Sequence, residues 1–226
     1  MSMRTRLLTI TTMLAAAALL QAGEGDKKRL AAADTMFKEI MDAGDRSIPR
    51  DLLRDSQCAV LIPGMKKAAF IGGGEYGRGF ALCRTDKGWS APVAVRMEGG
   101  NFGLEIGVSE TDLILLVKSK NGMDHLLKSK FTLGGDVTVA AGPVGRESTA
   151  NTDLTMHAEI LSWSRSRGVF AGIALRGATL RPDEDVDTIV YGHTVDRAAA
   201  LNGQVPPPKA AEALVQTLTR YSGVGK

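Results

Sequence analysis

The feature that most constrains how this chain folds is the density of glycine between Cys58 and Arg84. Two short runs of β-prone residues, CAVLI and AAFI, are separated by Pro63-Gly64, and five glycines follow closely. Glycine adopts backbone conformations that other side chains obstruct, so such a cluster lets the chain reverse or bend. Residues 99–103 repeat the order found at 73–77: two glycines, a polar residue, an aromatic residue and a glycine. The pattern predicts a β-meander, broken at Pro63-Gly64, with two similar corners in one curved sheet.

The glycines do not form a nucleotide-binding motif. Gly72, Gly74 and Gly77 have the spacing G-x-G-x-x-G, but a dinucleotide fingerprint must open a helix, and the following residues have the pattern of a strand. A kinase-type glycine hairpin requires a lysine where this chain has Arg96, and the sequences H-R-D and D-F-G are absent. We therefore interpret the cluster as turns and bulges.

Helical patterns lie at both ends of the chain. Residues 26–43 place apolar side chains on one face and mixed charges elsewhere, which predicts an amphipathic helix. This helix either covers the sheet or lies on a membrane surface, and its mixed charges favour the first alternative. Further helices are predicted from Ser47 through Leu53 and at 121–130, 183–191, 195–201 and 208–221.

Short apolar runs between these helices predict the strands of the sheet. They occupy 93–97, 104–108, 112–117, 131–141 and a hairpin of 158–163 with 169–175. The predicted fold class is α+β: a curved, glycine-rich antiparallel β-sheet, sandwich- or half-barrel-like, flanked by N-terminal and C-terminal helices.

The first residues resemble a targeting segment. Arg4 and Arg6 precede an apolar run from Leu7 to Leu20, and Leu20-Gln21-Ala22 is an acceptable cleavage site before Gly23. We interpret residues 1–22 as a secretory signal peptide, with an uncleaved anchor as the alternative, and residues 23–226 as a single domain. The predicted localisation is export to the periplasm or association with an outer membrane.

The net charge of the chain argues against nucleic acid as a partner. The formal charge is +3, and Arg4 and Arg6 supply two of these charges, so nucleic acid is not a predicted partner.

Cys58 and Cys83 are the two cysteines. In an exported chain they form either a disulfide bridge or two buried thiols, and the sequence leaves both possibilities open.

No catalytic set is recognisable. His125, His157 and His193 are isolated from one another, and neither H-E-x-x-H nor G-x-S-x-G occurs. The acidic run at 183–187 lacks the spacing of an EF-hand loop and suits the first turn of a helix. The sequence therefore predicts no enzyme activity, no metal site and no cofactor.

Several segments, in order, resemble the SYLF domain family. They are CAVLIPGMKKAAFIGGGEYGRGFALCR, WSAPVAV, GNFGLEIGVSETDLILLV, the run from Gly142 to Arg146, and RGVFAGIALRGATLRPDEDVDTIVYG. The similarity covers roughly residues 31–203. It implies a non-enzymatic domain that binds membrane lipids, phosphoinositides in eukaryotic members, and that is also known as an actin-binding module in fungal endocytic proteins. With a secretory signal, actin is an unlikely partner and anionic phospholipid of the envelope is the expected one.

Lipid binding requires a local cluster of basic residues, because each one near an anionic surface contributes about 1 kcal/mol. The candidates are Lys27, Lys28, Arg29, Lys66, Lys67, Lys118 and Lys120. Lys128 and Lys130, around the same short helix as Lys118 and Lys120, are further candidates, and Arg165 and Arg167 in a hairpin tip are weaker ones. Lysines at strand ends are commonly solvated and protect sheet edges from pairing, so each has a purely structural alternative. The rival function is an envelope protein-interaction or structural module that pairs through its sheet edges.

Overall fold

The computed structural model describes residues 24–69, 73–101, 107–127, 130–144, 157–166, 169–172, 175 and 177–223. Its centre is one curved sheet with the strand order β6-β10-β4-β2-β1-β5-β8-β7, to which β3 and β9 add short edges. The strands are β1 (Cys58–Ala69), β2 (Gly73–Thr85), β3 (Gly88–Trp89), β4 (Val93–Asn101), β5 (Gly107–Val117), β6 (Phe131–Thr132), β7 (Val139–Ala141), β8 (Ile160–Ser166), β9 (Val169–Gly172) and β10 (Thr179–Pro182).

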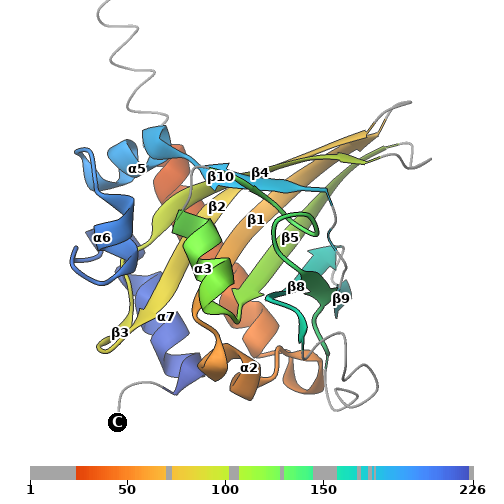
Figure 1. The fold of residues 1–226 in the computed structure, drawn as a ribbon, viewed down its shortest axis with the longest axis horizontal. Coiled ribbons are helices and arrows are strands. Elements are labelled where there is room, and N and C mark those ends of the chain that lie inside the picture. Colours follow the sequence, from red (N-terminus) through yellow and green to blue (C-terminus); the bar gives the residue numbers. More distant parts are fainter. Residues whose placement is uncertain are drawn as a thin grey trace, which may run out of the picture.

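Helices flank the sheet on both sides (Figure 1). They are helix 24–41, η1 (Gly44–Arg46), α2 (Arg50–Asp55), α3 (Lys120–Leu127), α5 (Glu184–Tyr191), α6 (Arg197–Leu201), η3 (Lys209–Ala211) and α7 (Glu212–Ser222). The predicted α+β class is confirmed, and the curled sheet is a half-barrel. The long strands β1, β2, β4 and β5 run together past the helices toward one corner of the molecule (Figure 1).

The alternation of side chains along the strands divides the interior into two cores. On β1, Ala59 and Leu61 face helix 24–41, α2, α5 and α7, whereas Val60 and Ile62 face α3 and α6. Successive side chains of a strand point to opposite faces, so the unbroken apolar run CAVLI fills both cores.

Helix 24–41 packs its apolar face into the first of these cores. Leu30, Phe37 and Ile40 are each at most 2% exposed. Thr217 of α7 donates a hydrogen bond of 2.5 Å to Asp34, and the Tyr221 hydroxyl donates to a carboxylate at the end of the helix. The prediction that this helix covers the sheet is therefore confirmed, and the alternative in which its apolar face lies on a membrane is wrong. Among the described residues, no helix combines the length and the apolar character needed to cross a membrane.

Several strand predictions are wrong. Separate strands were expected at 104–108 and 112–117, but the described residues 107–117 form the single strand β5. Pro63-Gly64 does not end a strand: β1 continues through it with a shift of register against both β2 and β5. The single strand expected at 131–141 is two, β6 and β7, separated by a turn, and β7 pairs with β8 in parallel. β10 was not predicted, because its four residues carry only one fully buried side chain.

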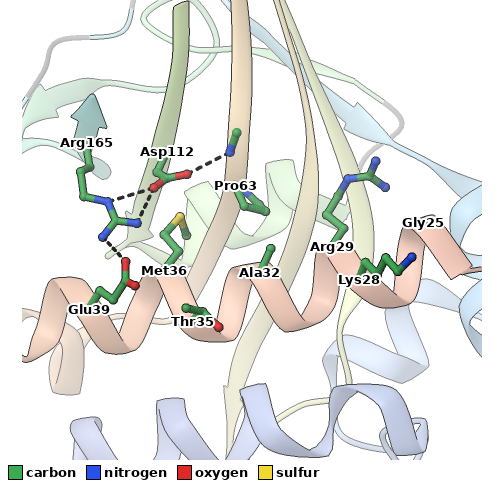
Figure 2. A pocket seen from close by; sticks show the side chains of 11 residues that line it. Gly25, Lys28, Arg29, Ala32, Thr35, Met36, Glu39, Pro63, Asp112 and Arg165 are labelled. Atoms are coloured by element: carbon green, nitrogen blue, oxygen red, sulfur yellow. Dashed lines mark hydrogen bonds and ion pairs between the residues drawn. The ribbon is translucent and has the colours of Figure 1, made fainter. Parts of the chain in front are cut away.

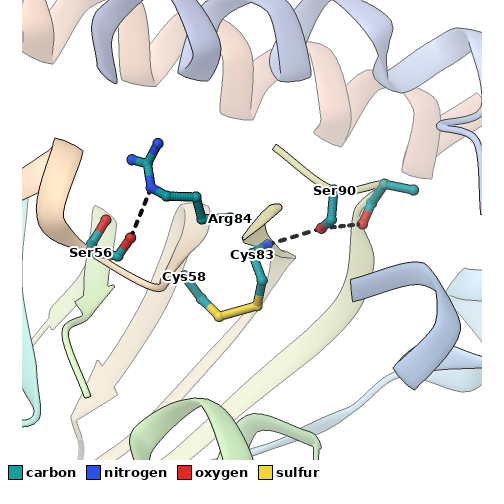
Figure 3. The surroundings of a disulfide bond; sticks show 6 residues. Ser56, Cys58, Cys83, Arg84 and Ser90 are labelled. Atoms are coloured by element: carbon teal, nitrogen blue, oxygen red, sulfur yellow. Dashed lines mark hydrogen bonds between the residues drawn. A yellow bond between two sulfur atoms is a disulfide. The ribbon is translucent and has the colours of Figure 1, made fainter. Parts of the chain in front are cut away.

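Cys58 and Cys83 are joined by a disulfide bond (Figure 3). They lie opposite each other in the β1–β2 register, and both side chains are buried. Beside the bridge, Ser90 accepts a hydrogen bond from the Cys83 amide, and Arg84 donates to the Ser56 carbonyl at the end of α2. The bridge thus ties the two central strands together where α2 meets the sheet.

Candidate functional site

A groove lies between helix 24–41 and the sheet (Figure 2). The helix contributes residues spaced three or four apart, which share one side of an α-helix. The sheet contributes the β1 segment Pro63-Gly64 and one residue each from β5 and β8. The cavity has a volume of about 540 Å³ and is lined by Gly25, Lys28, Arg29, Ala32, Thr35, Met36, Glu39, Pro63, Gly64, Asp112 and Arg165.

The floor of this cavity is a β-bulge in β1, which we call the β1 bulge (Pro63-Gly64). Gly64 has φ +60°, a left-handed conformation that favours glycine. Its amide donates a hydrogen bond of 2.9 Å to an Asp112 carboxylate oxygen on β5. Proline lacks an amide proton and suits a bulge, where the regular ladder is interrupted. The bulge bends β1 and exposes its backbone to the cavity.

An ion-pair relay closes one end of the cavity (Figure 2). Arg165 donates from Nε and Nη2 to one Asp112 oxygen at 2.9 and 2.7 Å, and from Nη1 to Glu39 at 2.5 Å. The relay connects the helix, β8, β5 and, through the Gly64 amide, the β1 bulge.

A second hollow of about 390 Å³ continues past the bulge. It is lined by Arg29, Pro63, Gly64, Lys66, Tyr76, Gly77 and Arg78, three of which also line the first. We call the two hollows together the basic groove. Outside the relay its charged lining side chains are all cationic: Lys28, Arg29, Lys66 and Arg78.

The two arginines in this part of the groove are held by carboxylates more buried than themselves. Arg29 pairs with Asp26, and Arg78 Nε lies 3.0 Å from Asp183, whose side chain is 2% exposed. The same Nε donates to the Tyr76 hydroxyl at 2.7 Å. Partial burial of Arg78 opposes its charge, yet the Asp183 carboxylate raises the pKa of the guanidinium above its ordinary value. Each guanidinium is thus paired with a carboxylate of the protein itself, and its hydrogen bond to Tyr76 further orients Arg78.

The structure brings together three of the seven basic residues proposed from the sequence: Lys28, Arg29 and Lys66. Lys27 is exposed on the helix but does not line the groove. Lys67 is in β1, not in a turn, and its side chain lies outside the described part of the structure. Among the remaining candidates, Arg165 lies on β8 and lines the groove, while Lys128 and Arg167 lie outside the described residues.

Lys118 and Lys120 lie at the far end of the sheet. Lys66 pairs with Glu110 across β1 and β5, so Lys118 is eight residues further along the chain. At about 3.3 Å per residue, that places it roughly 26 Å from the groove. The seven candidates therefore do not form one cluster.

Arg78 and Tyr76 were missed in the sequence. They are two residues apart on β2, so they share a face of the sheet, and the same face carries Lys66 through the Lys66–Tyr76 pair. This alternation was visible in GEYGRG, but only the pairing with β1 shows that the face opens on the groove. Among the described residues, no group of three or more His, Cys, Asp or Glu side chains is arranged to hold a metal ion.

Comparison with known proteins identifies similar chains. The model of the Ysc84 family, described as "Las17-binding protein actin regulator", matches residues 98–221. An SH3 domain-containing protein of Schizosaccharomyces pombe is 34% identical over 175 residues, which cover 76% of this chain and 40% of that protein. The SH3 domain-containing YSC84-like protein 1 of Rattus norvegicus is 32% identical over 82% of this chain and 56% of its own length. LAS seventeen-binding protein 3 of Saccharomyces cerevisiae is 31% identical over 77% of this chain and 39% of its own length.

These relatives correct the predicted localisation. They are proteins of yeasts and a mammal, organisms without the envelope that a periplasmic or outer-membrane location requires, and two of the three are named for an SH3 domain. The expectation of export to the periplasm or outer membrane is therefore wrong. Residues 1–22, interpreted as a signal peptide, lie outside the described part of the chain.

The matches also bear on the class of function. The family description and one relative name a binding partner, and none of the names given above is that of an enzyme. The chain spans about half the length, or less, of the relatives it matches. What those whole proteins bind is therefore not assigned to this part by the match alone.

Proposed function

Because the chain belongs to the Ysc84 (SYLF) family, we propose that it is a non-enzymatic binding domain whose basic groove holds the headgroups of anionic phospholipids. The observation that carries this proposal is the convergence of Lys28, Arg29, Lys66 and Arg78 on one groove. These residues come from a helix and two strands, so only the fold places them together.

The two lysines are free to bind an external anion. Lys66 is exposed and pairs with no carboxylate in the described part of the chain. The Lys28 side chain is 73% exposed, and its pair with Glu24 is equally open to solvent. Exposed ion pairs contribute little, so a headgroup can displace such a partner at small cost. At about 1 kcal/mol for each basic group near an anionic surface, the two lysines supply the larger part of the attraction, because Arg29 and Arg78 are already paired with carboxylates of the protein.

Electrostatics has to supply most of this attraction. The apolar face of helix 24–41 is buried in the core and is not available for insertion into a bilayer. An interaction driven by headgroup charge weakens as salt screens it, with a Debye length of about 8 Å at physiological ionic strength.

The experiment is vesicle flotation of the full chain with phosphatidylcholine vesicles, with and without phosphatidylserine, across a salt series. We expect binding only to the vesicles that contain phosphatidylserine, decreasing steadily as salt increases. Equal binding to both vesicle types, or no binding to either, would contradict the proposal.

A protein partner is the second candidate, and the names of the relatives favour it. The prediction that actin is an unlikely partner depended on export and falls with it. The relatives named for an SH3 domain carry a second recognition element, because SH3 domains bind proline-rich segments. Co-sedimentation of this chain with actin filaments tests whether a protein interaction belongs to the matched part. If the chain pellets with filaments and fails to float with vesicles, the protein-partner assignment replaces the lipid one.

A further inference from the structure

Arg165 is the one arginine lining the basic groove whose three guanidinium nitrogens all donate to carboxylates in the described structure. Nε and Nη2 donate to Asp112, and Nη1 donates to Glu39. The guanidinium nevertheless lies at the cavity wall, between Asp112 of β5 and Glu39 of helix 24–41 (Figure 2). Its charge is part of the groove but is neutralised by the protein itself.

The two carboxylates that hold Arg165 are not equivalent. Asp112 is 20% exposed and also accepts the Gly64 amide, so it is fixed from two sides within the sheet. Glu39 is 55% exposed and reaches Arg165 from the surface of helix 24–41 with one oxygen. An exposed pair between long side chains is weak, whereas a carboxylate fixed by two partners is costly to displace. Of the two, Glu39 is the one that an incoming anion can replace.

We propose that Arg165 is a further anion-binding residue of the groove and that Glu39 is its internal competitor. In the unliganded protein Glu39 occupies Nη1. When an anionic group enters the groove, the Glu39 side chain turns to solvent and the ligand oxygen accepts from Nη1, while Asp112 keeps the guanidinium in place. No proton or covalent bond is transferred in this exchange. The inference rests on the proposed function and assigns a regulator of affinity to the same site.

If Glu39 competes with the ligand for Arg165, removing the charge of Glu39 should increase the affinity of the protein for anionic vesicles. Glu39→Gln keeps the length of the side chain and its helix propensity, so the fold should be unaffected. Releasing one cation for the ligand is expected to raise apparent affinity for phosphatidylserine-containing vesicles about fivefold. The matched control is Glu212→Gln on α7, which changes the net charge equally at an exposed position that does not line the groove, and should have little effect.

A double-mutant cycle separates release of Arg165 from a general gain of charge. In an Arg165→Gln background, Glu39→Gln should change affinity no more than Glu212→Gln does, because the cation being released is absent. If Arg165→Gln fails to fold, the comparison of Glu39→Gln with Glu212→Gln in the wild-type background decides alone.

The outcomes distinguish this inference from the proposed function. If the wild-type protein binds but Glu39→Gln behaves as Glu212→Gln, or keeps its gain without Arg165, the inference is overturned and the proposed function stands. If neither the wild-type protein nor Glu39→Gln binds anionic vesicles, both are overturned.

Discussion

Replacing Gly79 by alanine is expected to lower the free energy of unfolding by about 3 kcal/mol or more, the largest effect of any single substitution proposed here. A Cβ atom at this position would lie 2.0 Å from the Leu61 carbonyl oxygen and 2.8 Å from the Ile62 Cα. Both atoms belong to the backbone of β1 just before the β1 bulge, where the strand bends over β2. Backbone atoms cannot move aside as a side chain can, so the central strands must separate or the bulge must shift.

The measurement is urea denaturation followed by circular dichroism, with the midpoint and the slope determined for both proteins. Gly74→Ala is the matched control, because it lies on the same strand and its Cβ would have no neighbour closer than 4.0 Å. Its midpoint should remain close to that of the wild-type protein. A Gly79→Ala midpoint equal to that of Gly74→Ala would show that β1 and β2 are not in contact at the bulge.

Reversing the charge of Lys28 and Lys66 together is expected to abolish binding to anionic vesicles. The double variant Lys28→Glu with Lys66→Glu changes the groove by four charge units. At about 1 kcal/mol for each unit near the surface, the apparent affinity should fall roughly a thousandfold. Both side chains are exposed, so the free energy of unfolding should change little. Flotation with phosphatidylserine-containing vesicles measures the loss.

The control is Lys87→Glu with Lys209→Glu, which makes the same change in net charge at two exposed lysines that do not line the groove. It should retain binding within a few-fold of wild type, since the groove keeps its cations. Equal losses in the two double variants would show that net charge, and not the groove, governs attachment.

Much of the fold was predictable because it depends on local pattern. The helix predicted at 26–43 is observed at 24–41, and the apolar run CAVLI fills the two cores as a central strand should. The β1 bulge was not predictable, because proline and glycine also signal a turn and the continuation of β1 depends on pairing with β2 and β5. The division of 131–141 into β6 and β7 was missed for the same reason. β6 pairs with β10 and β7 pairs with β8, and neither pairing is visible in the local sequence.

The groove was predictable only in part. Basic residues at 28, 29 and 66 were visible as clusters, but the sequence gives equal weight to Lys118 and Lys120, which the register of β5 places at the other end. Asp112 and Glu39 were not recognised, since a carboxylate that holds a bulge or an arginine has no local signature. Their roles depend on contacts between residues 48 or more positions apart.

Backbone hydrogen exchange of the full chain, measured with and without phosphatidylserine-containing vesicles, tests most directly whether the basic groove is the binding site. We expect the vesicles to slow exchange in residues 25–39 and in the segment from Gly64 to Lys66, and to leave α3 with the adjoining Lys118 unchanged. Slowed exchange at α3 with no change at the groove would contradict this assignment and place the membrane contact at the opposite end of the sheet.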